Sequence, residues 1–273
     1  LRREEFDLFI QLPDDLASLK TLVRNMIFAK TIKTQQAFGF QVRSTQLFKK
    51  IQVDKTIKNT ETKSLLNLLR DNGIPTKEIV FDLPTTRDHK QKVTSILTQK
   101  WGSNLKSSLI IAINPGGKRA TNRWPLERFV EVAKYLQEKH NAKIIITGGG
   151  SDTEKAQQIA KYLDQKLTLS TAGKLTLLES AELLKRCKMI IANSTGTIHL
   201  AAAVGTPAVG LYTIRDVAHR WSPYGENNIV LYHTGFSCHY KKEDCIKKSI
   251  EAITVSEVKN ACEKILTKKT EGK

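Results

Sequence analysis

The stretch that decides the fold is "IIANSTGTIHLAAAVGTPAVGLYT", residues 190–213 of the 273-residue chain. A short apolar run is followed there by Ser194, Thr195 and Gly196, and then by a helix of little more than alanines that contains His199. A second apolar run comes next. This order of apolar run, polar turn, small-residue helix and apolar run is typical of one strand–helix–strand unit of a parallel sheet.

The same alternation extends on the N-terminal side of this stretch. Continuous apolar runs occupy residues 107–114, 142–147, 167–170, 188–192 and 207–212. Amphipathic helices are predicted between them, at residues 124–140, from a Ser151–Glu154 capping box to Leu163, and from a Thr176–Glu179 capping box onward. Strands that are apolar on both faces and alternate with helices indicate a parallel sheet covered on both sides. We therefore predict an α/β, Rossmann-like domain.

Three of the predicted strands end in turns rich in glycine or hydroxyl groups. They are "NPGGKRATN" (114–122), "TGGGSD" (147–152) and "NSTG" (193–196). Ligands of parallel sheets bind beyond the carboxyl ends of the strands, so we expect these turns to meet at one rim of the sheet. None of them matches the dinucleotide fingerprint or a P-loop.

The turn at residues 193–196 has the chemistry of an anion site. A helix that starts near Thr197 leaves its first N–H groups unpaired and presents a positive dipole end, which suits a phosphate. Ser194 and Thr195 can bind the anion or cap the helix, Gly196 lets the backbone come close, and His199 lies about one turn in. The alternative is a hydroxyl cap, a packing glycine and a core histidine.

The turn after the first of these runs adds positive charge. Lys118, Arg119 and Arg123 lie beside Gly116 and Gly117, and cations on a flexible strand-end loop suit an anionic leaving group. A solvated basic loop is the alternative. Two phosphate-compatible turns on one rim together favour a nucleotide-diphosphate ligand.

The net charge of +17, from 44 Lys and Arg against 27 Asp and Glu, favours an anionic partner or, alternatively, a set of solvated lysine-rich helix faces. The basic stretches 239–248 and 264–273 lack the interleaved aromatic residues of a single-strand nucleic-acid surface. No apolar stretch approaches the ~20 residues of a membrane span.

The cysteines define neither a disulfide framework nor a clear metal site. Cys187, Cys238, Cys245 and Cys262 are few and scattered, and reduced thiols are expected. Zinc sites usually begin with a tighter cysteine pair than Cys238 and Cys245, although His239 lies between them.

The chain is expected to divide at residues 104 and 105. Strands are predicted at residues 6–12, 37–42 and 79–84, and the stretch 62–74 predicts a helix with Gly73 after its end. These strands are too few for a whole Rossmann-like domain, so residues 1–104 are interpreted as the latter part of an N-terminal domain whose start is missing. A helix and a polar exit at residues 85–106 would form the connection, and residues 105–273 the second domain.

Four stretches together resemble glycosyltransferase family 9, the family of the lipopolysaccharide heptosyltransferases. They are "NPGGKRATNRWPLERFVEVAKYL", "IIITGGGSDTEKAQQIA", "GKLTLLESAELLKRCKMIIANSTGTIHLAAAVGTPAVGLY" and "CHYKKEDCIKKSIEAITVSEV". The resemblance covers residues 110–260 closely and residues 1–105 loosely. It implies a GT-B fold with two Rossmann-like domains. It also implies an inverting transfer, without metal or other cofactor, of a heptose or related sugar from a nucleotide-diphosphate donor to a lipopolysaccharide core or similar glycolipid.

The resemblance also implies donor-binding roles by position. Gly117, Lys118 and Asn122 fall on the diphosphate-contacting loop, Glu154 on the ribose-binding acid and Leu175 on the nucleobase pocket. The set named for the donor site as a whole comprises Gly116, Gly117, Lys118, Asn122, Arg123, Glu154, Leu175, Ser194, Thr195, Gly196 and His199.

Two positions depart from the family pattern. Asn122 stands where heptosyltransferases usually have a lysine, and Ser194 replaces an aspartate that often contacts the donor sugar. A different nucleotide sugar therefore stays open. In this family a Gly-Asp pair follows the first strand of the N-terminal domain, and its aspartate is the expected base for the acceptor hydroxyl. No counterpart precedes residues 6–12, so no catalytic base is named.

The expected partners are the nucleotide-sugar donor, a glycolipid acceptor and an anionic membrane surface, with no nucleic acid. The expected location is cytoplasmic, with peripheral contact at the cytoplasmic face of the inner membrane. Two other classes stay open. One is a family member that binds nucleotides without transferring sugar, and the other, supported by charge alone, is a basic nucleic-acid-binding protein.

Overall fold

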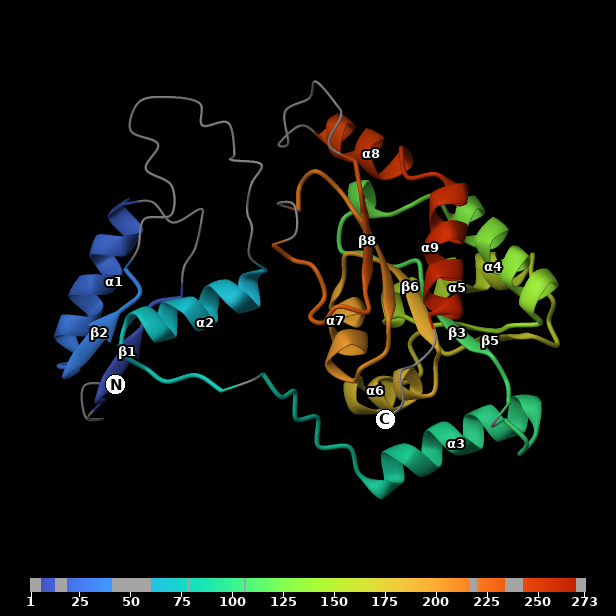
Figure 1. Ribbon diagram of the computed structural model, residues 1–273, viewed down its shortest axis with the longest axis horizontal. Helices are drawn as coiled ribbons and strands as arrows, with labels where there is room; N and C mark the ends of the chain where they lie inside the picture. The colour runs from blue at the N-terminus through green and yellow to red at the C-terminus, as the bar shows by residue number, and fades with distance from the viewer. Residues whose placement is uncertain are drawn as a thin grey trace. The chain divides into compact units, whose positions relative to one another are not determined.

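The computed structural model describes residues 6–12, 19–40, 60–77, 79–105, 107–216, 220–233 and 243–268 (Figure 1). The chain divides into two compact units, Leu1–Ile79 and Val80–Lys273. This division falls before the boundary expected at residues 104 and 105. The reason lies in α3 (Arg87–Trp101), which buries Val93 and Leu97 in a core of the C-terminal unit.

The C-terminal unit is built on a six-stranded parallel sheet. Its strands are β3 (Ile110–Asn114), β4 (Lys143–Ile146), β5 (Thr168–Ser170), β6 (Met189–Asn193), β7 (Ala208–Tyr212) and β8 (Ile229–Tyr232). They lie in the order β5-β4-β3-β6-β7-β8, and every neighbouring pair is parallel. The chain builds outward from β3 in one direction and from β6 in the other. The point at which the order reverses therefore lies between β3 and β6, and the predicted parallel sheet is confirmed.

Helices cover both faces of this sheet. They are α3, α4 (Leu126–His140), α5 (Thr153–Ala160), α6 (Leu177–Lys185), α7 (Gly196–Ala203), α8 (Glu243–Glu251) and α9 (Val255–Thr267). Because side chains alternate along a strand, Ile111 and Ile113 enter one core with α4, α5 and α9, while Ile110 and Ala112 enter the other with α3, α6 and α7. The sheet is buried on both sides, which explains its continuous apolar runs.

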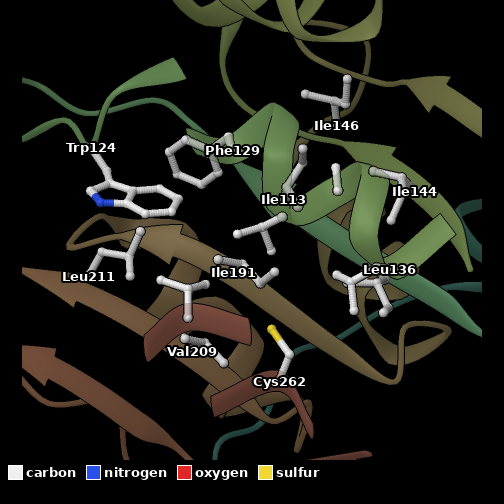
Figure 2. Packing of buried hydrophobic residues seen from close by; sticks show 14 of the residues in the cluster. Ile113, Trp124, Phe129, Leu136, Ile144, Ile146, Ile191, Val209, Leu211 and Cys262 are labelled. Atoms are coloured by element: carbon white, nitrogen blue, oxygen red, sulfur yellow. The ribbon is translucent and has the colours of Figure 1, made fainter. Parts of the chain in front are cut away.

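Figure 2 shows the first core, in which Trp124 and Phe129 pack edge to face over side chains of the central strands. The Trp124 ring is only 1% exposed, and its Nε1 donates to the Ile253 carbonyl at 2.8 Å. Trp124 lies just before α4, and Ile253 lies between α8 and α9. One buried indole therefore joins the start of α4 to the C-terminal helices.

One of the two predicted capping boxes is observed and the other is not. Thr176 and Glu179 form the predicted box, because each side chain accepts a hydrogen bond from the other residue's backbone N–H. The predicted Ser151–Glu154 box is wrong. A 3-10 turn at Gly150–Asp152 precedes α5, and Asp152 accepts a hydrogen bond from the backbone N–H of Gly149 at 3.1 Å.

The N-terminal unit contains a pair of parallel strands, β1 (Leu8–Ile10) and β2 (Gln36–Phe38), and two described helices, α1 (Leu19–Thr31) and α2 (Glu61–Asp71). The α2 helix ends as predicted, before Gly73 in the left-handed region at φ +78°. The strand predicted at residues 79–84 is wrong. That segment is fully described and forms no strand with any other described segment, and Val80 within it is 83% exposed.

The cysteines depart from the expectation of reduced thiols. Cys187 and Cys262 are free and buried, and burial raises the pKa of each thiol to about 12. Cys245 is disulfide-bonded. Cys238 and His239 lie outside the described residues. Within the described ranges, no group of three or more His, Cys, Asp or Glu side chains is placed to hold a metal ion, and no helix could cross a membrane.

Candidate functional site

The turns after β3 and β6 are joined by a buried asparagine. Asn193 is the last residue of β6 and is fully buried. Its side-chain oxygen accepts a hydrogen bond from the Trp124 backbone N–H, and its amide group donates to the carbonyls of Pro115 and Gly116, all at 3.0 Å. Buried polar groups in folded proteins are nearly always paired. Asn193 therefore fixes the turn that follows β3 against the end of β6.

Asn114, the last residue of β3, makes the reciprocal connection. Its side-chain oxygen accepts from the Gly116 backbone N–H at 2.8 Å, and its amide group donates to the Thr197 hydroxyl at 2.7 Å. Thr197 belongs to the first turn of α7. The "NPGG" and "NSTG" turns, distant in the sequence, thus lie side by side where the strand order reverses. In parallel sheets this is the position at which ligands bind.

The turn after β4 joins the same rim through Asp152. A side-chain carbon at Gly116 would lie 2.4 Å from the Asp152 carboxylate, and one at Gly148 would lie 2.9 Å from it. Both glycines are therefore needed to let the Asp152 side chain pack between the turns. For Gly116, which was predicted as a donor-binding residue, this packing is a structural reason for glycine that sequence reasoning did not supply.

The predicted basic residues differ in their contacts. Arg123 donates from Nε to the Gly117 carbonyl at 2.8 Å and so holds its own turn together. Lys118 and Arg119 are exposed, and within the described residues neither forms an ion pair. Asn122 ends the 3-10 turn Ala120–Asn122, and its side-chain oxygen is buried without a hydrogen-bond partner.

The start of α7 does not have an ordinary hydroxyl cap. Thr195 occupies the N-cap position, yet its side chain makes no capping hydrogen bond, and its buried Oγ1 has no partner in the described part of the chain. The N–H groups of the first helical turn, which begins at the exposed Gly196, keep the positive dipole end described above. The capping alternative for Thr195 is therefore not the observed arrangement.

His199 is exposed, and its side chain makes no hydrogen bond with any residue that the structure describes. The core-histidine alternative is not observed either. Partial desolvation of the ring lowers the imidazole pKa below its ordinary value, so the ring is neutral at pH 7. A neutral imidazole can donate a hydrogen bond from one nitrogen and accept one at the other.

The two remaining predicted residues stand further along the rim. Glu154 is exposed in the first turn of α5 and accepts a hydrogen bond from Gln158 at 3.3 Å. Leu175 is half-buried directly before α6 and packs against the second core. In the described part of the chain, no hydrogen bond connects either residue to the turns after β3 and β6.

Sequence reasoning missed the segment that follows β7. Burial raises the pKa of the Asp216 carboxyl, against the opposing effects of a backbone hydrogen bond at Thr213, the Ser194 hydroxyl and Arg215. Burial also raises the pKa of Tyr212, whose side chain contacts the same Ser194 hydroxyl. The signal available in the sequence was the rule already applied to the other strands, because polar residues also follow the apolar run of β7.

Unpaired buried polar atoms mark this rim. Among the described residues, six buried side-chain atoms have no hydrogen-bond partner, and all six follow the carboxyl ends of β3, β6 and β7. They are Thr121 Oγ1, Asn122 Oδ1, Thr195 Oγ1, Arg215 Nε, Asp216 Oδ2 and Ser222 Oγ. An unpaired buried polar group costs about 1–3 kcal/mol, so a cluster of them is typical of a site that a ligand completes.

The chain belongs to glycosyltransferase family 9, the heptosyltransferases, whose family model matches residues 1–250. Over 224 residues it is 23% identical to the lipopolysaccharide core heptosyltransferase OpsX of Haemophilus influenzae, a match that covers 80% of this chain and 62% of that protein. It is also 30% identical to the lipooligosaccharide heptosyltransferase 2 of the same organism over 107 residues. This match covers 38% of this chain and 31% of that protein. The chain thus spans less than two thirds of the length of these curated relatives.

Solved structures share its fold. A glycosyltransferase family 9 protein from Veillonella parvula superposes with a TM-score of 0.72 at 23% identity, covering 97% of this chain and 74% of that one. The ADP-heptose heptosyltransferase II of Escherichia coli superposes with a TM-score of 0.63 at 21% identity, and the match covers 97% of this chain and 78% of that one. The expected GT-B type α/β fold with parallel sheets is confirmed.

Proposed function

We propose that the chain is a glycosyltransferase that binds the nucleoside diphosphate of its sugar donor on the turns after β3 and β6. The observation that carries this proposal is the pair of buried asparagines, Asn114 and Asn193, which hold the two turns together at the reversal of strand order. Beside them, at the start of α7, Thr195 presents a buried hydroxyl that has no partner among the described residues.

The proposed chemistry is stabilisation of the departing diphosphate. Negative charge grows on the phosphate oxygens as the bond to the sugar breaks, and N–H groups at a helix start together with a hydroxyl donor stabilise that charge. Lys118 and Arg119 lie close to the same turn and form no ion pair with a described residue, so they can supply positive charge to the diphosphate. Asn122 offers an acceptor oxygen, which suits a hydroxyl of the ribose or sugar rather than a phosphate.

The donor and acceptor are proposed from the relatives. The matched relatives are named as lipopolysaccharide and lipooligosaccharide heptosyltransferases, and the E. coli heptosyltransferase WaaC, whose fold is also similar (TM-score 0.57), was solved with ADP. We infer that this chain transfers a heptose or related sugar, with inversion, to a lipopolysaccharide core or similar glycolipid. Its net charge of +17 supports peripheral contact with the anionic cytoplasmic face of the membrane.

The second candidate is a family member that binds the nucleotide without transferring sugar. Ser194 in place of the family's aspartate favours it. Turnover of a nucleotide sugar in the presence of acceptor distinguishes the two candidates, since only a transferase would release the nucleoside diphosphate at a rate that depends on acceptor.

Calorimetric titration of the chain with ADP, UDP, GDP and CDP tests the binding site. We expect one nucleotide to bind selectively and Thr195→Ala to weaken it about tenfold, because a hydrogen bond to a charged phosphate contributes about 1.5–3 kcal/mol. His199→Ala should weaken it as well. Thr267→Ala is the matched control, since Thr267 is an exposed threonine at the end of α9. Equal binding by Thr195→Ala and the wild type would exclude the proposed phosphate site.

A further inference from the structure

The segment after β7 holds a carboxylate that no role described so far uses. Asp216 follows β7 by a short turn, in which its backbone N–H donates to the Thr213 carbonyl at 3.0 Å. One carboxylate oxygen, Oδ2, is buried and has no hydrogen-bond partner among the residues that the structure describes. A buried acceptor without a protein partner is unfavourable unless a bound ligand or an ordered water donates to it.

The neighbours of Asp216 place it beside the diphosphate turn. The Ser194 hydroxyl acts on its carboxyl as a hydrogen-bond partner that lowers the pKa, and the Ser194 backbone N–H donates to the Leu211 carbonyl of β7 at 3.0 Å. The Asp216 charge also raises the pKa of the Tyr212 and Tyr232 phenols. These three neighbours end or directly follow β6, β7 and β8. Ser194 is also the direct chain neighbour of Thr195, whose unpaired hydroxyl is proposed to bind phosphate. Asp216 therefore lies one side chain away from the proposed leaving group.

The chemistry of this position selects one part of a donor. A carboxylate repels a phosphate, so the unpaired oxygen of Asp216 would oppose binding of the diphosphate itself. A sugar hydroxyl donates to a carboxylate in a charge-assisted hydrogen bond and can at the same time accept one. Arg215 Nε, in the adjacent residue, is a buried donor without a partner in the described ranges, while Nη2 of the same guanidinium lies 4.0 Å from Glu243 Oε1. The Asp216 carboxylate accepts hydrogen bonds and the Arg215 nitrogen donates one. Together they can pair with sugar hydroxyl groups, which both donate and accept.

We propose that Asp216, together with Ser194, binds hydroxyl groups of the sugar that the donor carries, and so contributes to the choice of that sugar. This inference rests on the proposed function, because it assumes that the donor's diphosphate lies on the turns after β3 and β6. It assigns the sugar to the side of the rim formed by β6, β7 and β8. The opposing explanation is a structural one, in which Asp216 only holds the turn that starts at Thr213.

Calorimetry with matched ligand pairs separates these explanations. The pairs are ADP with ADP-heptose and UDP with UDP-glucose, titrated into the wild type and into Asp216→Asn. We expect the wild type to bind one sugar conjugate more tightly than its nucleoside diphosphate. Asp216→Asn should weaken that conjugate about tenfold while changing the affinity for the nucleoside diphosphate less than about twofold. Asp164→Asn, which makes the same chemical change at an exposed carboxylate before β5, is the control and should change neither.

An exchange variant tests the pairing with Ser194. Ser194→Asp alone places a second carboxylate against Asp216 and should weaken the conjugate. Ser194→Asp combined with Asp216→Asn returns a single carboxylate to the pair and should recover part of the lost affinity. A residue that only holds its turn would show no such recovery. Thermal unfolding of each variant shows whether any loss of binding comes from loss of the fold.

Three results would overturn the inference. If the wild type binds a nucleoside diphosphate but no conjugate more tightly, the sugar subsite does not exist. If Asp216→Asn weakens both members of a pair equally, or neither, Asp216 is structural. If the wild type binds no nucleoside diphosphate at all, the proposed function fails and this inference fails with it, so the two failures are distinguishable.

Discussion

Asn193 shows how much one buried amide determines at the residue scale. Its oxygen accepts one backbone hydrogen bond and its nitrogen donates two, so only an amide in this orientation pairs all three backbone groups. A carboxylate of the same shape could accept but not donate. The residue therefore does not have to touch a ligand in order to decide the geometry of the proposed donor site.

We expect Asn193→Asp and Asn193→Ala each to lower the free energy of unfolding by about 2–4 kcal/mol, because they leave buried carbonyls or an N–H group unpaired. Urea denaturation measures the loss. Asn260→Ala, at an exposed residue of α9, serves as the control for the loss of an amide side chain. A change in Asn193→Asp of less than about 0.5 kcal/mol would contradict this assignment.

The sequence allowed the residues of two turns to be predicted, because hydroxyl, glycine and basic residues directly follow apolar strands. It did not reveal that Gly116 is needed for the packing of Asp152, or that Asp216 contacts Ser194. Both contacts join residues that are distant in the chain, and they arise only when the strand order brings separate turns together. Periodicity and spacing contain no information on such contacts.

At the scale of elements, α4 and α9 are joined by a cluster around Glu263. One carboxylate oxygen accepts from the Tyr135 hydroxyl at 2.8 Å, lies 2.7 Å from His140 Nε2 and lies 3.2 Å from Lys139 Nζ. The hydrogen bond with His140, more than the other contacts, lowers the pKa of Glu263 to about 2. The three partners all belong to α4, so this one glutamate fixes α9 against it.

This cluster predicts an acid-dependent loss of stability. A carboxyl whose pKa is lower in the folded than in the unfolded chain stabilises the fold above its unfolded pKa. That contribution is lost as the pH falls from about 4.5 toward about 2. We expect the wild type to lose about 1 kcal/mol more than Glu263→Gln over this range, allowing for solvent at a partly exposed site. Denaturant unfolding at each pH measures the difference. Parallel curves for the wild type and Glu263→Gln would contradict it, and Glu127→Gln on the exposed side of α4 is the control.

The central elements were predictable because β3, β4, β6 and β7 are buried on both faces and therefore form continuous apolar runs. The edge strand β8 was not predicted. It is only half-buried and short, and it depends on its pairing with β7 rather than on its own pattern. Strand pairing also explains the wrong prediction at residues 79–84, where a strand was expected and none forms. An apolar run without a partner strand does not form a strand.

At the scale of the whole molecule, both buried cores and every predicted donor-site residue lie in Val80–Lys273. We therefore expect residues 80–273, produced alone, to unfold cooperatively and to bind the selected nucleoside diphosphate within about threefold of the affinity of the full chain. Calorimetry and thermal unfolding of this fragment measure both properties. A fragment that folds but binds no nucleotide would show that residues 1–79 supply part of the donor site. Acceptor-dependent turnover should be absent from the fragment.

The position of Trp124 matters for fluorescence measurements on this protein. Its indole ring is shielded from water in the first core, while its backbone N–H is bonded to Asn193 at the rim. A fluorophore inside the core is thus connected by one hydrogen bond to the proposed donor site. If a ligand displaces the turn after β3, the surroundings of this indole change as well, and variants that lack Trp101 and Trp221 would report that change by fluorescence without an attached dye.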